Sequence, residues 1–350
     1  MSLNLSVCYG GLFLESPIVV GACPITTDDQ TRTNLEIAGA GAIVLPSLFE
    51  EQVIAWTQKL GQPATDRDLE LVARSKRLNV RAACRDADTY LALVNRAGTM
   101  QSIPIIASMN GYSHSGWLDF AGELQAAGAA GIEINIHGST LDYRLSPNQI
   151  EDAIVGALAE LKQSISVPLF VKLQPAGISI PHLARRSCSG TDGMVLYGRS
   201  PVTDICLDSL RLKSTWNLTE PGSACQLLEP LMEVHAACPS MSLAASGGIA
   251  STEDVLKVFL AGADVAMVTS ELYRSGPSVV RQLLDGLTTY LEHHQFQSLL
   301  DLQLHRPLKF DSDEARELYT EALAARVCSN PSKPAYRNVY GDRWGHPTAS

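Results

Sequence analysis

The chain lacks the cysteine and histidine spacings that hold metal ions. Its eight cysteines are scattered over 350 residues, and no C-x-x-C or His-x3-His pair is present to complete a zinc site. No cysteine spacing fits an iron–sulfur cluster, so a cluster that serves this protein would belong to a partner. Scattered cysteines are typical of small buried side chains in a reducing compartment.

Basic clusters and long apolar runs are also missing. The 27 Lys and Arg residues are outnumbered by 37 Asp and Glu residues, the net charge is −10, and no basic cluster stands out. This composition excludes the electrostatic footprint of a nucleic-acid-binding protein. The N-terminus has no signal-like pattern, and no run is long enough to span a bilayer. We expect a cytoplasmic protein without a membrane partner.

Short apolar segments alternate with longer amphipathic ones along the chain. This alternation, in a chain with 45% hydrophobic residues, is the pattern of repeated βα units around a parallel sheet. Eight segments are predicted as strands, which is the number in a (β/α)8 TIM barrel. They are residues 17–22, 42–45, 103–107, 131–136, 167–172, 192–197, 241–245 and 264–268.

Helices are predicted between most of these strands and after the last one, and several end in a recurring turn. In this turn Ala-Gly-Ala directly precedes a strand, and Gly41, Gly128 and Gly262 suit the positive φ that follows a helix. The predicted helices are residues 28–39, 116–127, 147–163, 223–237, 251–261 and 277–293.

Two regions are longer than the barrel rhythm requires. Residues 48–101 carry a polar stretch, and residues 198–221 alternate apolar and polar positions as a short antiparallel excursion does. Both are predicted to be insertions over the C-terminal face of the barrel. We predict a barrel domain over residues 1–306 and a partly irregular extension over residues 307–350.

The most informative passage pairs two consecutive strand ends that consist of small residues. Ser246-Gly247-Gly248 follows one predicted strand, and Thr269-Ser270 follows the next. Glycines allow the backbone to approach an anion closely, and the serine hydroxyls can donate hydrogen bonds. A Gly-Gly pair alone often marks only a tight turn, whereas this pairing over consecutive units predicts a bound phosphate.

Polar side chains follow the other strands at the face where barrel enzymes place their active sites. Lys172 ends an apolar strand, where it either snorkels to solvent or supplies positive charge to an electron-rich ligand. Ser47, Ser108 and Asn135 could bond the polar edge of a heterocycle, although each could instead be a satisfied core residue.

The loop after residue 136 holds the candidates for proton transfer. His137 titrates near neutral pH and could act as a general base, although a histidine after a strand is often structural. Ser139 is an alternative, and Asp142 and Tyr143 are weaker ones.

Together these residues resemble the dihydroorotate dehydrogenase family of flavoproteins over about residues 3–310. The resemblance rests on Tyr9-Gly10-Gly11-Leu12, on Ser16-Pro17-Ile18-Val19, on the residues 38–42, 132–136 and 171–173, and on Thr191-Asp192-Gly193. It also includes the phosphate passage described above. The resemblance implies an FMN-dependent oxidoreductase of pyrimidine biosynthesis that acts on the CH-CH group of a small substrate, and it implies a homodimer with a redox partner protein.

The same resemblance implies which residues bind the FMN. The ring system is expected against the backbone at Ala22 and against Ser108, Asn135 and Lys172, with Lys172 also stabilising the reduced flavin. The phosphate is expected against Gly222, Gly247, Gly248, Thr269 and Ser270, and we add Ser47 and Ser246 as cofactor contacts from their positions at strand ends.

The chain departs from the family on the substrate side. Gly138 stands where the family has a Cys or Ser base, Pro46 replaces a lysine, and Gly198 replaces an asparagine. Two other functions are therefore kept open. One is an FMN-binding electron-transfer or partner subunit without dihydroorotate activity, and the other is a flavin-free barrel enzyme that binds a phosphorylated substrate.

Overall fold

The structure is a computed structural model that describes residues 3–78, 83–111, 118–136, 145–173, 179–198, 201–307 and 309–324. The chain divides into two compact units, Met1–Pro307 and Leu308–Ser350. The second unit contains helix α13 (Ser312–Ala324). The candidate site lies in the first unit.

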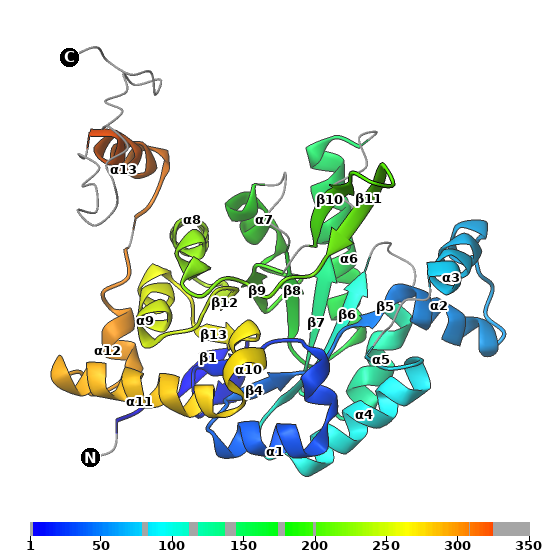
Figure 1. Ribbon diagram of the computed structural model, residues 1–350, viewed down its shortest axis with the longest axis horizontal. Coiled ribbons are helices and arrows are strands. Elements are labelled where there is room, and N and C mark those ends of the chain that lie inside the picture. Colours follow the sequence, from blue (N-terminus) through cyan, green and yellow to red (C-terminus); the bar gives the residue numbers. More distant parts are fainter. Residues whose placement is uncertain are drawn as a thin grey trace. The chain divides into compact units, whose positions relative to one another are not determined.

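A closed parallel barrel forms the centre of the first unit (Figure 1). Nine of the described strands form one sheet in the order β4-β3-β13-β12-β9-β8-β7-β6-β5, and a further pairing of β4 with β6 closes it. Because β5 (Leu48–Phe49) is a two-residue strand beside β6, the other eight strands make the predicted (β/α)8 barrel. They are β3 (Ile18–Val20), β4 (Ala42–Val44), β6 (Ile105–Gly111), β7 (Gly131–Ile136), β8 (Leu169–Lys172), β9 (Gly193–Leu196), β12 (Ser242–Ser246) and β13 (Val265–Val268).

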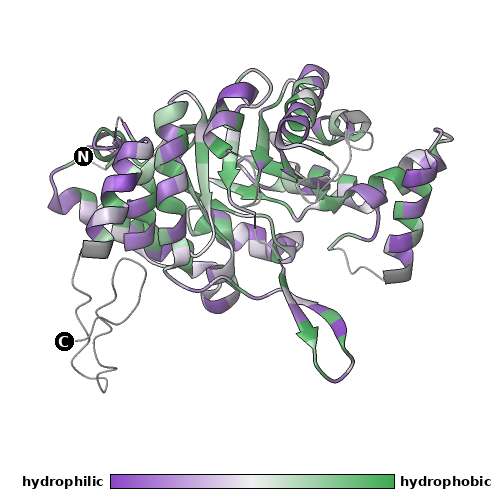
Figure 2. Ribbon diagram, turned by 90° about the horizontal axis from the view of Figure 1, so that it is seen from above, coloured by the Kyte–Doolittle hydropathy of each residue, from purple (hydrophilic) through white to green (hydrophobic). Residues whose placement is uncertain are grey.

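Amphipathic helices surround the strands, and many begin at a capping side chain. Ser146 and Ser251 each accept a hydrogen bond from the backbone three residues on, which satisfies an otherwise unpaired amide at the helix start. Figure 2 shows hydrophobic residues along the barrel strands and hydrophilic residues on the outer helices. The helices are α1 (Asp29–Ile37), α4 (Ala87–Met100), α5 (Leu118–Ala126), α6 (Pro147–Ser164), α7 (Ile180–Ser187), α8 (Leu228–Ala237), α9 (Thr252–Ala261), α10 (Ser270–Ser275), α11 (Ser278–His293) and α12 (Leu299–Gln303), with short 3-10 turns η1 (Pro24–Thr27) and η3 (Ser223–Leu227).

The Ala-Gly-Ala turn is built differently after the first helix than the sequence suggests. The positive φ of 97° belongs to Gly39, whereas Gly128 and Gly262 have the expected positive φ values of 103° and 126°. Gly41 is required for another reason, because a Cβ there would lie 1.9 Å from the Ser16 carbonyl oxygen. A glycine here allows two backbone segments to approach closely.

A hairpin of β1 (Val7–Tyr9) and β2 (Leu12–Leu14) covers the N-terminal end of the barrel. The Tyr9 ring stacks on Phe170 inside the barrel at a centroid distance of 4.3 Å. The amide of Gly10 donates to the hydroxyl of Ser242, the first residue of β12, at 3.0 Å. Because the hairpin covers this end, ligands reach the barrel interior from the opposite, C-terminal end.

Both insertions have their own secondary structure. Residues 48–101 contain β5, α2 (Glu50–Lys59) and α3 (Asp66–Leu78), followed by α4, which contacts β6 as a barrel helix. Within residues 198–221, β10 (Val202–Cys206) pairs with β11 (Arg211–Thr215) in the antiparallel arrangement that the sequence predicts. In the part of the chain that the structure describes, no helix combines the length and apolar character of a membrane span.

Candidate functional site

A cavity of about 590 Å³ opens at the C-terminal ends of the barrel strands. This volume lies within the range that small-molecule and cofactor sites occupy. The structure brings most of the predicted cofactor residues together around it, namely Ala22, Ser47, Asn135, Lys172, Ser246, Gly247, Gly248, Thr269 and Ser270. Its wall also includes Cys23, Asn110, Tyr197, Trp216, Gln226 and Tyr273.

Lys172 is held at the cavity by a buried carboxylate that the sequence analysis did not single out. The Lys172 Nζ lies 3.3 Å from Oε1 of Glu133, and the two side chains are 9% and 1% exposed. The other carboxylate oxygen, Oε2, has no hydrogen-bond partner among the described residues. A buried charge is costly unless it is paired, so the ammonium and the carboxylate each depend on the other.

One signal in the sequence could have identified Glu133. Residues of a strand alternate between its two faces, so Glu133 and Asn135 share one face of β7. Since Asn135 was assigned to the barrel mouth, a charged residue two positions earlier had to point into the barrel as well.

Ser108 does not line the cavity, but its side chain contacts Ser47, which does. Its hydroxyl is 2.8 Å from that of Ser47, and it donates to Oε1 of Glu133 at 3.0 Å. The ring hydroxyl of Tyr90 contacts both the amide and the carbonyl of Ser108, at 2.8 Å and 3.0 Å. Ser108 therefore supports Glu133 and Ser47 from below, while Ser47 lines the cavity.

Two amide side chains make the adjoining part of the wall. Asn135 donates to Oδ1 of Asn110 at 2.7 Å, because the register of β6 and β7 places these residues opposite each other. Asn135 is in turn opposite Lys172 on β8. The three strands thus present amide, amide and ammonium groups side by side, which suits the polar edge of a planar heterocycle.

The glycine passage forms a backbone cradle on the other side of the cavity. Gly247 and Gly248 have φ values of 120° and 71°, which other residues rarely adopt. A Cβ on Gly248 would lie 2.4 Å from the amide nitrogen of Ala224, so this position also needs the missing side chain. Gly222, which is absent from the cavity wall, donates to the carbonyl of Gly248 at 2.9 Å.

Thr219 occupies the hydrogen-bonding groups of this cradle. The amide of Gly248 donates to its hydroxyl at 3.1 Å, and the same hydroxyl lies 2.9 Å from that of Ser270. Amides and hydroxyls that converge in this way are the donors that a phosphate requires.

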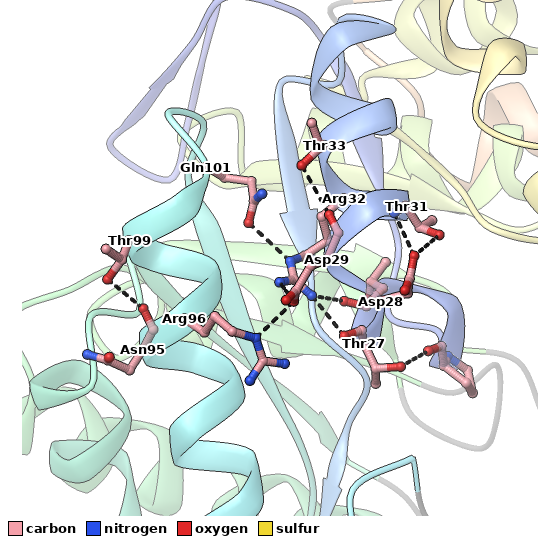
Figure 3. Close-up of polar contacts among 12 residues, drawn as sticks. Thr27, Asp28, Asp29, Thr31, Arg32, Thr33, Asn95, Arg96, Thr99 and Gln101 are labelled. Carbon is pink, nitrogen blue, oxygen red and sulfur yellow. Dashed lines mark hydrogen bonds and ion pairs between the residues drawn. The ribbon is translucent and has the colours of Figure 1, made fainter.

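A fully buried arginine, Arg32, holds the turn after β3 through polar contacts, several of which are drawn in Figure 3. Arg32 donates through Nη1 to the carbonyls of Thr26 and Thr27 at 2.9 Å and 3.0 Å, and through Nε to Gln101 at 3.0 Å. It also pairs with Asp29, which Arg96 of α4 binds as well. Because Thr26 and Thr27 belong to η1, this cluster holds the turn that carries Pro24 to the cavity.

Two titratable groups of the wall remain neutral at physiological pH. Burial raises the pKa of the Cys23 thiol to about 12. Burial also raises the pKa of Tyr197, with a smaller effect from Glu233. Both groups can therefore act as hydrogen-bond donors, and neither is a base near neutral pH.

The candidates for proton transfer lie outside the described residues. His137, Ser139, Asp142 and Tyr143 all belong to this group, as does Gly138. Their role stays a prediction from the sequence. Gly198, which stands where the family has an asparagine, is among the described residues and lines the cavity.

The described residues contain no group of three His, Cys, Asp or Glu side chains that could hold a metal ion. The cavity instead offers an ammonium, amides, hydroxyls and backbone N–H groups. This donor set suits an organic ligand with a polar heterocycle and an anionic group.

No protein-family model matches the chain, but individual proteins do. It is similar to the catalytic subunit of dihydroorotate dehydrogenase B (NAD(+)) of Thermoplasma acidophilum, at 22% identity over 307 residues that cover 85% of this chain and 97% of that protein. It is similar to dihydroorotate dehydrogenase A (fumarate) of Limosilactobacillus reuteri, at 23% identity over 314 residues that cover 85% and 97%.

A solved structure has the same fold. The crystal structure of DHODH in complex with ferulenol from Eimeria tenella matches with a TM-score of 0.59 and 16% identity, covering 87% of this chain and 89% of that one. This match confirms the barrel fold. The two sequence relatives confirm the resemblance to the dihydroorotate dehydrogenase family.

Proposed function

We propose that the protein is an FMN-dependent oxidoreductase that acts on the CH-CH group of a dihydroorotate-like small substrate. The observation that carries the proposal is the pairing of two features in one cavity. A glycine cradle faces it at Gly247 and Gly248, and a polar layer of Asn135 and Lys172 lines it at neighbouring strand ends. A bound flavin requires both features, backbone donors for its phosphate and polar side chains for the edge of its ring.

The residues present fit FMN in size and in chemistry. The cavity volume is within the range of cofactor sites, and the site of Gly248 leaves no room for a side chain between the cradle and η3. Gly247, Gly248, Thr269 and Ser270 would hold the phosphate, with Gly222 and Ser246 supporting the turn. The backbone at Ala22 and the side chains of Ser47, Asn135 and Lys172 would hold the ring system, with Ser108 beneath them.

Bound FMN supplies hydride transfer at its N5 atom. Lys172 contributes a positive charge where negative charge develops during reduction, and Glu133 holds its ammonium in place at 3.3 Å. Asn135 orients its carboxamide through the hydrogen bond to Asn110. His137 or Ser139 would transfer a proton at the substrate carbon next to the one that exchanges hydride with the flavin.

The substrate side points to a changed specificity. Gly138 offers no proton-transfer group, and the loss of a positioned base typically costs about 10²- to 10⁴-fold in rate. Pro46 and Gly198 remove two further hydrogen-bonding side chains. We therefore propose a substrate related to dihydroorotate but held by other contacts.

Spectroscopy and rapid kinetics test this function. The purified protein, with added FMN if needed, should absorb between about 350 and 500 nm, as a bound flavin does. Stopped-flow reduction with dihydroorotate should be slowed in Lys172→Ala and His137→Ala, whereas Lys257→Ala on the exposed face of α9 should match the wild type.

The other two functions appear as distinct outcomes of this test. A flavin that dithionite reduces but no dihydropyrimidine reduces would favour an electron-transfer or partner subunit. Failure of dihydroorotate alone would exclude that one substrate and leave the flavin assignment intact. A colourless protein that FMN cannot reconstitute would refute the flavin assignment and favour a flavin-free enzyme.

We further propose that the protein is cytoplasmic and works as a homodimer with a redox partner protein. The apolar side chains of the β10–β11 hairpin support a protein partner, since Leu207, Leu210 and Leu212 are 82%, 79% and 80% exposed. The named relative from Thermoplasma acidophilum is a catalytic subunit, which is consistent with a redox partner. Sedimentation of the wild type tests the homodimer, and a monomeric wild type would refute it. The variant Leu207→Asp/Leu212→Asp tests whether the hairpin forms the dimer interface, in which case the variant should be monomeric.

A further inference from the structure

Two cysteines from different barrel units meet on the outside of the barrel. Cys188 follows the last residue of α7, and Cys238 follows the last residue of α8. Their Sγ atoms lie 2.7 Å apart, although the residues are separated by 50 positions in the sequence. The Cys188 Sγ also contacts the carbonyl of Ala184 at 3.0 Å, which fixes its direction.

This pair lies at the opposite end of the barrel from the cavity. Cys188 and Cys238 stand in the turns that lead into β9 and β12, whose first residues Gly193 and Ser242 are paired. The cavity is lined instead by residues that follow the strands, such as Ser246. The two thiols are therefore independent of the proposed cofactor and substrate chemistry.

The geometry needs little change for the sulfurs to form a covalent bond. A disulfide has an S–S distance of about 2.05 Å, so the two atoms must approach by only about 0.65 Å. The surroundings also differ in a useful way, because Cys188 is exposed and Cys238 is buried. An oxidant can reach the first sulfur, and the second is placed to react with the product.

We propose that Cys188 and Cys238 form a reversible intrachain disulfide in exchange with a low-molecular-weight disulfide such as glutathione disulfide. The Cys188 thiolate attacks one glutathione sulfur, which forms a mixed disulfide and releases one glutathione thiolate. The Cys238 thiolate then attacks the Cys188 sulfur and releases the second glutathione. The two protein thiols lose two electrons and two protons, and glutathione disulfide gains both.

The bond would stabilise the fold without changing the cavity. It closes a loop that contains the β10–β11 hairpin, Thr219 and Gly222, and a disulfide over a loop of this length restricts the unfolded chain strongly. It also ties α7 to α8, which already pack against each other. Partial desolvation of its sulfur raises the pKa of Cys188 to about 11, with a further effect from the neighbouring Cys238 thiol, so we expect the exchange to be slow at neutral pH.

Non-reducing peptide mapping and melting temperatures test the proposal on the full chain. After incubation with glutathione disulfide, mass spectrometry should find a peptide that links Cys188 to Cys238, and dithiothreitol should remove the link. Oxidation should raise the melting temperature of the wild type by at least about 5 °C.

Matched variants make the result specific. Cys188→Ser and Cys238→Ser should each lose the shift between oxidised and reduced samples, whereas Cys225→Ser, at an exposed cysteine in the same loop, should keep it. Because the oxidised and reduced forms of the same variant are compared, any effect of the substitution itself on the melting temperature cancels. A stable glutathione adduct on Cys188 without the link, a link to another cysteine, or an equal shift in the Cys238→Ser variant would overturn the proposal.

Discussion

The buried ion pair of Glu133 and Lys172 at the cavity can be tested by its effect on the free energy of unfolding. Replacing Lys172 with Met keeps most of its volume but removes the ammonium, which leaves the carboxylate with only the Ser108 hydroxyl on Oε1 and no partner on Oε2. Breaking a buried ion pair on one side typically costs about 3–5 kcal/mol. We expect this loss in the free energy of unfolding of Lys172→Met.

The double variant Lys172→Met/Glu133→Gln should recover most of that loss. A neutral amide no longer carries the cost of a buried charge, so the double variant should lie within about 1–2 kcal/mol of the wild type. The second substitution should therefore restore about 1–4 kcal/mol, a coupling that non-interacting residues do not show.

Urea denaturation of the wild type, Lys172→Met, Glu133→Gln and the double variant, all freed of bound ligand, measures this cycle. Ligand must be absent because binding to the native state adds its own stabilisation. If the double variant is less stable than Lys172→Met, then Glu133 stabilises the barrel by itself and the pairing argument is refuted.

Three further substitutions test other parts of the site. Arg32→Met should lower the free energy of unfolding by about 3–5 kcal/mol, since it leaves two carbonyls of η1 and the side-chain oxygen of Gln101 without their donor, and a loss below about 1 kcal/mol in urea denaturation would contradict this. Gly248→Ala should weaken FMN binding in a fluorescence titration by at least about tenfold more than Gly247→Ala, because both have positive φ but only Gly248 lacks space for a Cβ. Hydrogen bonding by Thr89 lowers the pKa of Asp86, the N-cap of α4, to about 2. The stabilisation that the Asp86 carboxylate gives to the fold is therefore complete above about pH 4 and is lost as the pH falls toward 2. The difference in melting temperature between the wild type and Asp86→Ala should disappear over that interval, and a constant difference would refute the cap assignment.

The barrel could be predicted because each strand is signalled locally. The run 264–268 is apolar after Asp264, directly follows a helix and a glycine turn, and becomes β13 within one residue of the prediction. The β1–β2 hairpin was missed, because its short strands are stabilised by the distant contact of Tyr9 with Phe170. No local pattern encodes a contact of this kind.

The candidate site was predictable to the extent that strand ends converge. Gly248 and Lys172 were found from their positions alone, since all parallel strands end at one face. Arg32 was not, because in the sequence it is an ordinary charged residue of an amphipathic helix. Only the packing of Gln101 and η1 around it makes it a buried structural residue.

Thr219 gives the phosphate cradle an internal competitor. Its hydroxyl accepts the Gly248 N–H at 3.1 Å, so an anion that takes this N–H must displace the hydroxyl first. The affinity of the cradle is then the difference between two complete sets of hydrogen bonds, rather than the sum of the new ones. A threonine that touches no reacting atom thereby sets how tightly the site retains its ligand.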